Sequence, residues 1–313
     1  MTAVEPSTTT DARPAAPPSW RRTVGVYVSL MKLRVVELLL VTTLPAMVLA
    51  ARGLPPLGLV AATLAGGTLA AGSAHAFNQV LERDIDAVMR RTRRRAVATA
   101  AVSPQAAALF AASLLLAAVA LMLAFVNPLA AALTVAANVF YVVVYTVLLK
   151  RRTPQNIVWG GVAGCLPTLI GWAAVTESLA WPPVLLFLVV FFWTPPHYWP
   201  LAMRFRDDYA RAGVPMLPVV APARVVATQI LAYSWAMVAT TLALWWVAGL
   251  GWLYGVLATL AGVWFLAEAH RLHTRARSDG SGAGLKAMRL FHGSITYLTV
   301  VFAAVALDVL LST

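Results

Sequence analysis

The sequence has one cysteine and few charged residues, and both shortages restrict what the protein can be. Cys165 is the only cysteine among 313 residues, which excludes a disulfide framework or a thiolate metal site within one chain. Charged residues make up 12% of the chain, whereas soluble domains usually carry about 25%. Hydrophobic residues reach 60% and the mean hydropathy is +0.77, so the composition indicates an integral membrane protein.

The beginning of the chain lacks an apolar segment with a cleavage site. Residues 1–20, MTAVEPSTTTDARPAAPPSW, are rich in Pro, Ala, Thr and Ser, so we expect a disordered tail and not a signal peptide. Apolar runs recur along the rest of the chain and leave no room for a separate soluble domain. We therefore expect residues 21–313 to form a single membrane-embedded domain.

The apolar runs predict an all-α polytopic membrane protein. Breaks at Pro, Gly and charged residues delimit nine candidate transmembrane helices, at residues 36–52, 56–80, 104–126, 128–149, 156–176, 182–203, 224–248, 250–269 and 288–310. Only Arg52, among 24 Lys and Arg residues, falls outside the loops of one side. The positive-inside rule then places the N-terminus in the cytoplasm and the C-terminus outside. We expect the nine helices to surround a central cavity.

This placement of cations also explains the net charge of +12. Lys and Arg residues that set topology contact anionic lipid at the cytoplasmic surface, so the basic composition does not indicate nucleic-acid binding. The expected location is the cell membrane.

Acidic residues are scarce, yet several of the 12 Asp and Glu residues gather on the predicted cytoplasmic side. In NQVLERDID, Asn78, Glu82 and Asp86 follow i, i+4, i+8 spacing, which places three oxygen-bearing side chains on one helix face. Asp84 points away from that face. Carboxylate and amide oxygens suit Mg²⁺, which takes one or two carboxylates together with water and phosphate oxygens.

A second acidic pair, Asp207 and Asp208, follows the sixth predicted span in RFRDDYARAGV. Arginines flank the pair, and guanidinium groups bind phosphate through two parallel hydrogen bonds. Acids for a metal ion beside arginines for phosphate predict a site for an organic diphosphate at this face. The competing interpretation is that each cluster is a solvated helix end whose acids pair with neighbouring arginines.

At these residues the sequence resembles the UbiA-type intramembrane prenyltransferase superfamily. Within it, the sequence is similar to the protoheme IX farnesyltransferases, or heme O synthases, from about Met31 to Asp308. The segments that carry this similarity are NQVLERDIDAVMRRT, RTPQNIVWGG and FFWTPPHYWPLAMRFRDDYARAGVPMLPVV. RTPQNIVWGG and TPPHYW are characteristic of the heme branch.

The resemblance implies roles for residues at matching positions. It implies catalytic roles for the two Asp-rich motifs, Asn78, Glu82, Asp84 and Asp86 in the first and Asp207 and Asp208 in the second. All of these except Asp84 are implied ligands of Mg²⁺, with two ions expected. The implied diphosphate-binding residues are Lys32, Arg34, Arg90, Lys150, Arg151 and Arg204. Glu82 departs from the family, since many relatives have Asp there.

The implied reaction transfers the farnesyl group of farnesyl diphosphate to a vinyl group of heme b, with addition of water, and gives heme O and diphosphate. Heme b is then a substrate and not a prosthetic group. The implied partners are farnesyl diphosphate, heme b, membrane lipid and a downstream heme A synthase or oxidase, with the active site toward the cytoplasm. Two alternatives remain open: a prenyltransferase for an aromatic or quinone precursor, and a heme or lipid transporter.

Histidines within apolar runs are the remaining candidates. His197 follows Pro195–Pro196, which we expect to kink or break the helix, and it either hydrogen-bonds freed carbonyls or contacts heme. His75 lies one turn before the first acidic cluster and has the same two interpretations. We expect His270 and His273 in a solvated loop at the cytoplasmic rim.

Overall fold

The computed structural model describes residues 20–278 and 282–312, without the side chains of residues 34–40, 282 and 283. Residues 1–19 of the predicted tail lie outside the described residues. All regular elements in the described part are helical, which confirms the all-α prediction. They are α1 (Trp20–Leu30), α2 (Leu33–Ala51), α3 (Leu57–Leu81), α4 (Arg83–Val88), α5 (Pro104–Phe125), α6 (Pro128–Val139), the π-helix η1 (Phe140–Leu149), α7 (Asn156–Gly160), α8 (Val162–Thr176), α9 (Trp181–Arg204), α10 (Arg206–Arg211), α11 (Leu217–Val220), α12 (Ala223–Val247), α13 (Trp252–Arg277), the 3-10 helix η2 (Gly282–Leu285) and α14 (Ala287–Ser312).

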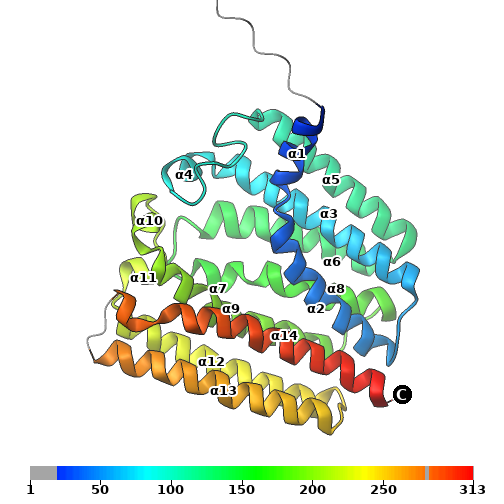
Figure 1. Ribbon diagram of the computed structural model, residues 1–313. Helices are drawn as coiled ribbons and strands as arrows, with labels where there is room; N and C mark the ends of the chain where they lie inside the picture. The colour runs from blue at the N-terminus through cyan, green and yellow to red at the C-terminus, as the bar shows by residue number, and fades with distance from the viewer. Residues whose placement is uncertain (1–19, 279–281, 313) are drawn as a thin grey trace, which may run out of the picture.

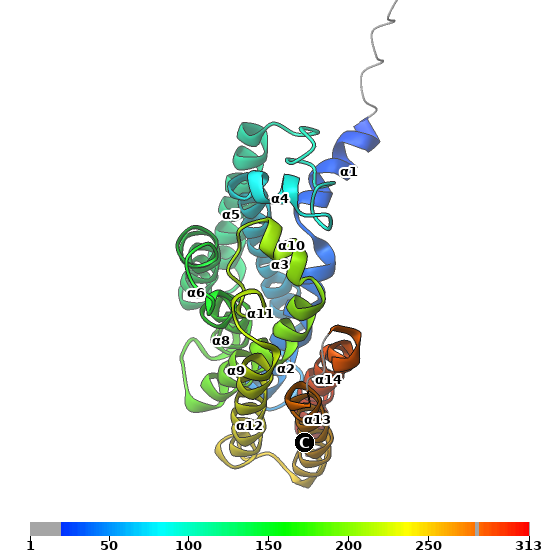
Figure 2. The ribbon, with the colours of Figure 1, turned by 90° about the vertical axis from the view of Figure 1, so that its left-hand side faces the viewer.

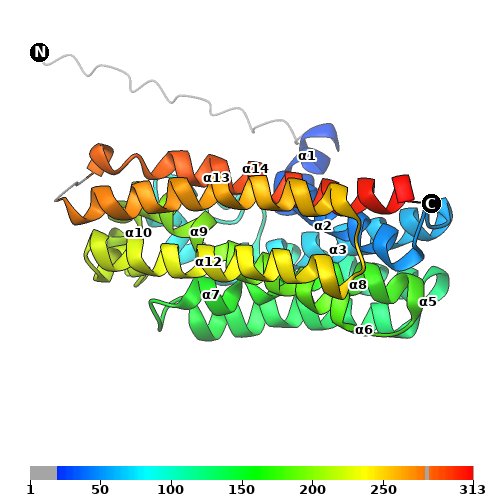
Figure 3. The same ribbon diagram turned by 90° about the horizontal axis from the view of Figure 1, so that it is seen from below.

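The long helices lie side by side in one bundle (Figures 1 and 3). The short helices α4, α10 and α11 gather at one end of this bundle, which the side view shows facing the reader (Figure 2). The C-terminus lies at the opposite end (Figures 1 and 3). The residues of both acidic clusters therefore belong to the same end, as the predicted alternation of spans requires.

Eight helical segments of the described chain are long and apolar enough to cross a bilayer. They are Leu57–Leu81, Pro104–Phe125, Pro128–Leu149, Asn156–Thr176, Trp181–Arg204, Ala223–Val247, Trp252–Arg277 and Ala287–Ser312. The chain is therefore a multi-pass membrane protein. At the first predicted span, α2 contains a shorter apolar helix, Val41–Ala51, so nine crossings stay a prediction, as do the central cavity and the sides on which the termini lie.

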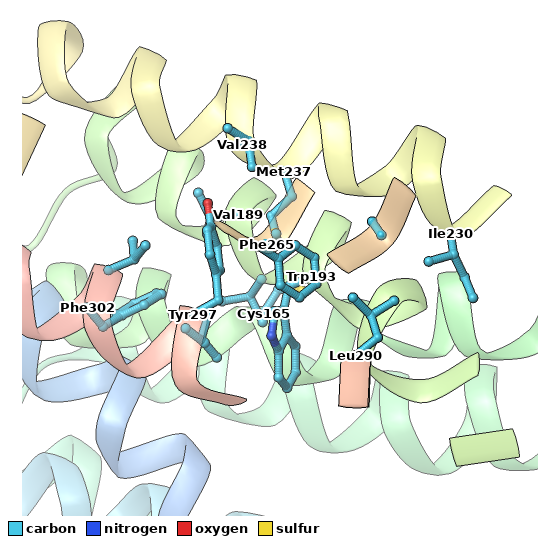
Figure 4. Packing of buried hydrophobic residues seen from close by; sticks show 14 of the residues in the cluster. Cys165, Val189, Trp193, Ile230, Met237, Val238, Phe265, Leu290, Tyr297 and Phe302 are labelled. Carbon is cyan, nitrogen blue, oxygen red and sulfur yellow. The ribbon is translucent and has the colours of Figure 1, made fainter. Parts of the chain in front are cut away.

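Apolar side chains cover both the inside and the outside of the bundle. Trp193 of α9, Met237 of α12, Phe265 of α13 and Tyr297 of α14 pack together in the interior (Figure 4). On the outer surface Trp246 is 80% exposed. A large apolar side chain left open in this way is expected where lipid, and not water, surrounds the protein.

Two local expectations are wrong. Helix α9 continues through Pro195, Pro196 and Pro200, so the predicted break is wrong; α8, α12 and α14 pack along this helix and hold it in place. Helix α13 continues to Arg277, so His270 and His273 lie on a helix and not in a loop. An ion pair between Glu268 and Arg271, three residues apart, supports this extension with a distance of 2.5 Å.

Candidate active site

The first acidic cluster lies where α3 meets α4. Glu82 departs from helical geometry, with φ −108° and ψ 14°, yet the backbone N–H of Glu82 donates to Asn78 and that of Asp86 donates to Glu82. The three side chains consequently share one face, as their spacing predicts. Asn78, Glu82 and Asp86 are 2%, 1% and 2% exposed, whereas the side chain of Asp84 is 60% exposed.

Each of these three buried side chains receives a hydrogen bond from a cation that another segment supplies. The donors and acceptors are Lys32 Nζ and Asn78 Oδ1 at 3.3 Å, Lys150 Nζ and Glu82 Oε2 at 2.5 Å, and Arg95 Nη1 and the Asp86 carboxylate oxygens at 2.7 and 2.8 Å. Buried charges require such partners, because desolvation of an unpaired charge costs several kcal/mol. The site therefore joins the loop before α2, the end of η1 and the loop after α4.

The π-helix η1 places two of these contacts. The hydroxyl of Thr146 donates to Tyr141 O, five residues earlier, and the backbone N–H of Lys150 donates to Tyr145 O at the same spacing. This wider register brings Thr146 Oγ1 within 3.2 Å of Asn78 Nδ2 and carries Lys150 to Glu82. Pi-helical turns are often found at functional sites.

Unpaired polar atoms remain in this region. Glu82 Oε1 and Asn156 Oδ1 are buried and have no hydrogen-bond partner within the described residues. Burial lowers the pKa of Lys32 to about 7, and the neighbouring cations Arg95 and Lys150 lower it further. The site thus holds both free acceptor oxygens and a surplus of closely spaced cations.

The second acidic pair lies on α10. Asp208 is 5% exposed and pairs with Arg211, whereas Asp207 is exposed. Arg91 links α10 to the first cluster, because its Nη2 donates to Tyr209 Oη at 3.1 Å from the loop that follows α4. Tyr209 Oη in turn lies 3.0 Å from Tyr198 Oη of α9.

The structure places the predicted phosphate-binding cations in different settings, and only some of them contact the first acidic cluster. Lys32 and Lys150 lie in the first cluster, and Arg151 instead binds the exposed Asp84 at 2.7 and 2.8 Å. These hydrogen bonds lower the pKa of Asp84 to about 2. Arg90 and Arg204 are exposed on the same end, and the side chain of Arg34 lies outside the described residues.

The oxygen ligands of the first acidic cluster fit Mg²⁺ only if water and substrate phosphate supply the rest of its coordination shell. Within the described part of the chain, no three His, Cys, Asp or Glu side chains gather into a group that could hold a metal ion alone. The free Oε1 of Glu82 and the oxygens of Asn78 and Asp86 share one face, and Mg²⁺ commonly takes one or two carboxylates and completes its shell with water and substrate phosphate. These residues therefore suit an ion that enters with a diphosphate.

His197 is held in one orientation by α14. Its Nδ1 lies 2.8 Å from Ser294 Oγ, and its ring stacks between Trp193 and Phe291, with centroids 4.1 and 4.7 Å away. The single hydroxyl proton of Ser294 is donated to Phe291 O at 2.6 Å. Nδ1 must then donate to Ser294 Oγ, which leaves the lone pair of the neutral imidazole on Nε2.

His75 has a different setting on α3. It is 8% exposed, meets Tyr141 edge to face at 5.4 Å, and its Nδ1 lacks a hydrogen-bond partner among the described residues. The two predicted heme contacts, His75 and His197, belong to separate packing environments.

Several residues of the site were not predicted from the sequence. Each of them contacts a residue that is distant in the sequence. The contacts are Arg95 with Asp86, 9 residues apart, Thr146 with Asn78, 68 residues apart, and Tyr209 with Arg91, 118 residues apart. Arg95 stands in the basic run RRTRRR, where no local pattern distinguishes it from its neighbours. The other two depend on helix packing.

Comparisons with known proteins agree with this architecture. Residues 39–307 match the model of the UbiA prenyltransferase family. A protein of Nocardioides sp. named protoheme IX farnesyltransferase is 56% identical over 289 residues, covering 92% of both chains, and one of Leifsonia xyli with the same name is 58% identical over 290 residues, covering 93% of this chain and 94% of that one.

Solved structures share the fold at low identity. A structure described as digeranylgeranylglyceryl phosphate synthase in membranes has a TM-score of 0.76 at 15% identity and covers 91% of this chain and 98% of its own. A UbiA homologue from Archaeoglobus fulgidus bound to GPP and Mg²⁺ has a TM-score of 0.59 at 17% identity and covers 90% of this chain and 99% of its own.

Proposed function

Because the chain belongs to the UbiA prenyltransferase family, we propose that it transfers the farnesyl group of farnesyl diphosphate to a vinyl group of heme b. The products are heme O and diphosphate, and one water supplies the hydroxyl group of the new side chain. The family resemblance predicted from the sequence is confirmed by the match over residues 39–307. The relatives named protoheme IX farnesyltransferase support heme b as the acceptor.

The observation that carries the chemistry is the buried row of Asn78, Glu82 and Asp86, each held by a cation from another segment. Cleavage of the allylic C1–O bond of farnesyl diphosphate leaves negative charge on the departing diphosphate. Lys32, Lys150 and Arg95 are already fixed beside the row and can stabilise that charge without reorganising. A diphosphate beside Lys32 would also favour its charged form and raise its pKa.

Mg²⁺ is the cofactor that fits this row. When bound, it supplies a Lewis acid that neutralises charge on the phosphate oxygens. Asn78, Glu82 and Asp86 would hold one ion, and Asp207 and Asp208 are the proposed ligands of a second. The solved homologue with GPP and Mg²⁺ supports this pairing of a prenyl diphosphate with the metal in the same fold.

The acceptor requires a second part of the site. Nε2 of His197 carries the free lone pair and the ring is held by Ser294, so this nitrogen is the proposed contact to heme, with His75 as a second candidate. An imidazole whose other nitrogen is fixed by a hydrogen bond is the usual arrangement for an iron ligand. Farnesyl diphosphate and membrane lipid are the other proposed partners, together with a downstream heme A synthase or oxidase.

Reconstituted protein tests the reaction. Incubation with farnesyl diphosphate, heme b and Mg²⁺ should give a farnesylated heme that mass spectrometry detects, and removal of Mg²⁺ with a chelator should stop its formation. Turnover of a quinone precursor without any heme product would favour the alternative acceptor and contradict heme b.

Two single substitutions test the acidic clusters in the same assay. Asp86→Ala and Asp208→Ala should each lower kcat by about 100-fold or more, because each removes a carboxylate that would hold the Mg²⁺ that stabilises charge on the diphosphate. Glu177→Ala is the matched control, since Glu177 is an exposed acid in the turn between α8 and α9, apart from both clusters. Wild-type turnover in both test variants would refute the two-cluster metal site.

A further inference from the structure

A shallow groove opens between α12 and α13, and its exposed lining is largely apolar. It has a volume of about 540 Å³ and is lined by Arg224, Val225, Thr228, Gln229, His273 and Arg277. Arg224 lies in the first turn of α12 and Arg277 in the last turn of α13, so the groove lies at the bundle end where α10 and α11 gather (Figures 1 and 3).

Within the described part of the chain, acids do not compensate the positive charge of the groove. Among the described residues, no Asp or Glu oxygen lies within ion-pair distance of Arg224 or Arg277. Among the described residues of the same end, Arg95, Arg151 and Arg211 each pair with an acid, whereas Arg93 and Arg94 do not. Two guanidinium groups that line one groove without an acidic partner among the described residues favour an anionic occupant.

Neighbouring polar groups add hydrogen-bond donors to this charge. Gln229 Oε1 accepts a hydrogen bond from Gln155 Nε2 at 3.1 Å, which leaves the amide N–H groups of Gln229 available. His273 stands one turn from Arg277 on α13 and supplies an imidazole. The lining therefore presents guanidinium groups and amide donors beside a largely apolar surface, and this combination suits a phosphate that carries hydrocarbon chains.

The surface beyond the groove is suited to hydrocarbon. On α12, Trp235 is 53% exposed and its indole N–H donates to His270 Nε2 of α13 at 3.3 Å. Tryptophan with a hydrogen-bonded N–H is typical of the level where headgroups meet acyl chains. Farther along α13, Leu260 and Val263 are 63% and 64% exposed, on the face that also carries His270.

We propose that this groove binds the phosphate of an anionic phospholipid, whose acyl chains lie along the exposed apolar face of α12 and α13. A lipid headgroup is favoured over free phosphate because three features follow one another along the same pair of helices. They are the two arginines of the groove, Trp235, and the exposed apolar side chains of Leu260 and Val263. The residues that line this groove are distinct from those of the acidic row, so the site does not depend on the reaction proposed above.

Native mass spectrometry of the purified, delipidated full-length protein tests the site. Dioleoyl phosphatidylglycerol should be retained in preference to dioleoyl phosphatidylcholine, and Arg224→Gln with Arg277→Gln should lower phosphatidylglycerol retention by about tenfold or more. The charge-preserving pair Arg224→Lys with Arg277→Lys should keep most of the retention. Should the double Gln variant fail to fold, Arg277→Gln alone should lose part of the retention.

A matched control separates this groove from general basicity. Arg93 and Arg94 are exposed, and neither forms an ion pair within the described part of the chain, so Arg93→Gln with Arg94→Gln removes the same charge elsewhere. Equal retention of phosphatidylglycerol by wild type and by the folded groove variant would overturn the proposal. Displacement of the lipid by millimolar inorganic phosphate would mark a free-anion site and would overturn the lipid assignment.

Discussion

The hydroxyl of Ser294 on α14 fixes the orientation of the His197 imidazole on α9. Its proton goes to Phe291 O at 2.6 Å, so its oxygen accepts from Nδ1 of His197. Ser294→Ala removes that acceptor and frees the imidazole to exchange tautomers. Since loss of such a supporting contact commonly costs 10–100-fold in affinity, we expect the KM for heme b to rise by about tenfold while the KM for farnesyl diphosphate stays unchanged.

Ser294→Thr is the conservative control for this substitution. Ser294→Thr keeps the hydroxyl and should therefore keep the wild-type KM for heme b. If a general packing defect caused the effect of Ser294→Ala, keeping the hydroxyl would not be enough to preserve this KM. Steady-state kinetics with each substrate varied in turn measure both constants. An unchanged KM for heme b in Ser294→Ala would show that the orientation of His197 does not matter for the acceptor.

At the residue scale, spacing identified the acids better than it identified their partners. The i, i+4, i+8 pattern places Asn78, Glu82 and Asp86 on one buried face, because helical periodicity is a local property. Arg95 was not distinguished from the basic residues around it, since its contact with Asp86 depends on the path of the loop after α4. Tertiary contacts of this kind have no local sequence pattern.

At the scale of elements, the beginning of α13 is held by a side chain of α14. Asp308 is 3% exposed, and its carboxylate accepts hydrogen bonds from the backbone N–H groups of Gly251 at 2.6 Å and Tyr254 at 3.1 Å. The first N–H groups of a helix have no partner within the helix and carry partial positive charge. Asp308 therefore acts as an N-cap from 57 residues away.

Asp308→Ala leaves these N–H groups without an acceptor. We expect the free energy of unfolding to fall by about 2 kcal/mol, and the Tm by roughly 3 °C, given the usual cost of a lost cap and the size of the chain. Thermal unfolding in detergent measures the shift. Ser312→Ala is the control, because Ser312 only donates to Asp308 O from the exposed end of α14. Equal Tm values for Asp308→Ala and wild type would exclude the capping role.

Helix positions were predictable from hydropathy, but their details were not. The predicted runs 56–80 and 104–126 lie within one residue of α3 and α5 at each end, because apolar length is a direct signal of a span. The π-helical register of η1 has no marker in FYVVVYTVLL, and its effect appears only when Thr146 meets Asn78. The proline pair does not end α9, because the surrounding helices keep that helix continuous.

At the scale of the whole molecule, the charge distribution predicts which end faces the cytoplasm. The loop after α4, the segment after η1 and the helix α10 carry nine of the 21 arginines, whereas the turn between α8 and α9 at the other end has none. The positive-inside rule then places Ala101 inside and Ser178 outside. Both positions are exposed, and Cys165, the single native thiol, is buried with 0% exposure.

Thiol labelling in intact cells tests this orientation. A membrane-impermeant maleimide should label Ser178→Cys directly, and it should label Ala101→Cys only after the cells are permeabilised. Unmodified protein supplies the background, which should be low because Cys165 packs inside the bundle and its Sγ donates to Gly161 O. Labelling of Ala101→Cys in intact cells, with protection of Ser178→Cys, would invert the topology and place the acidic row and the basic groove on the outer face.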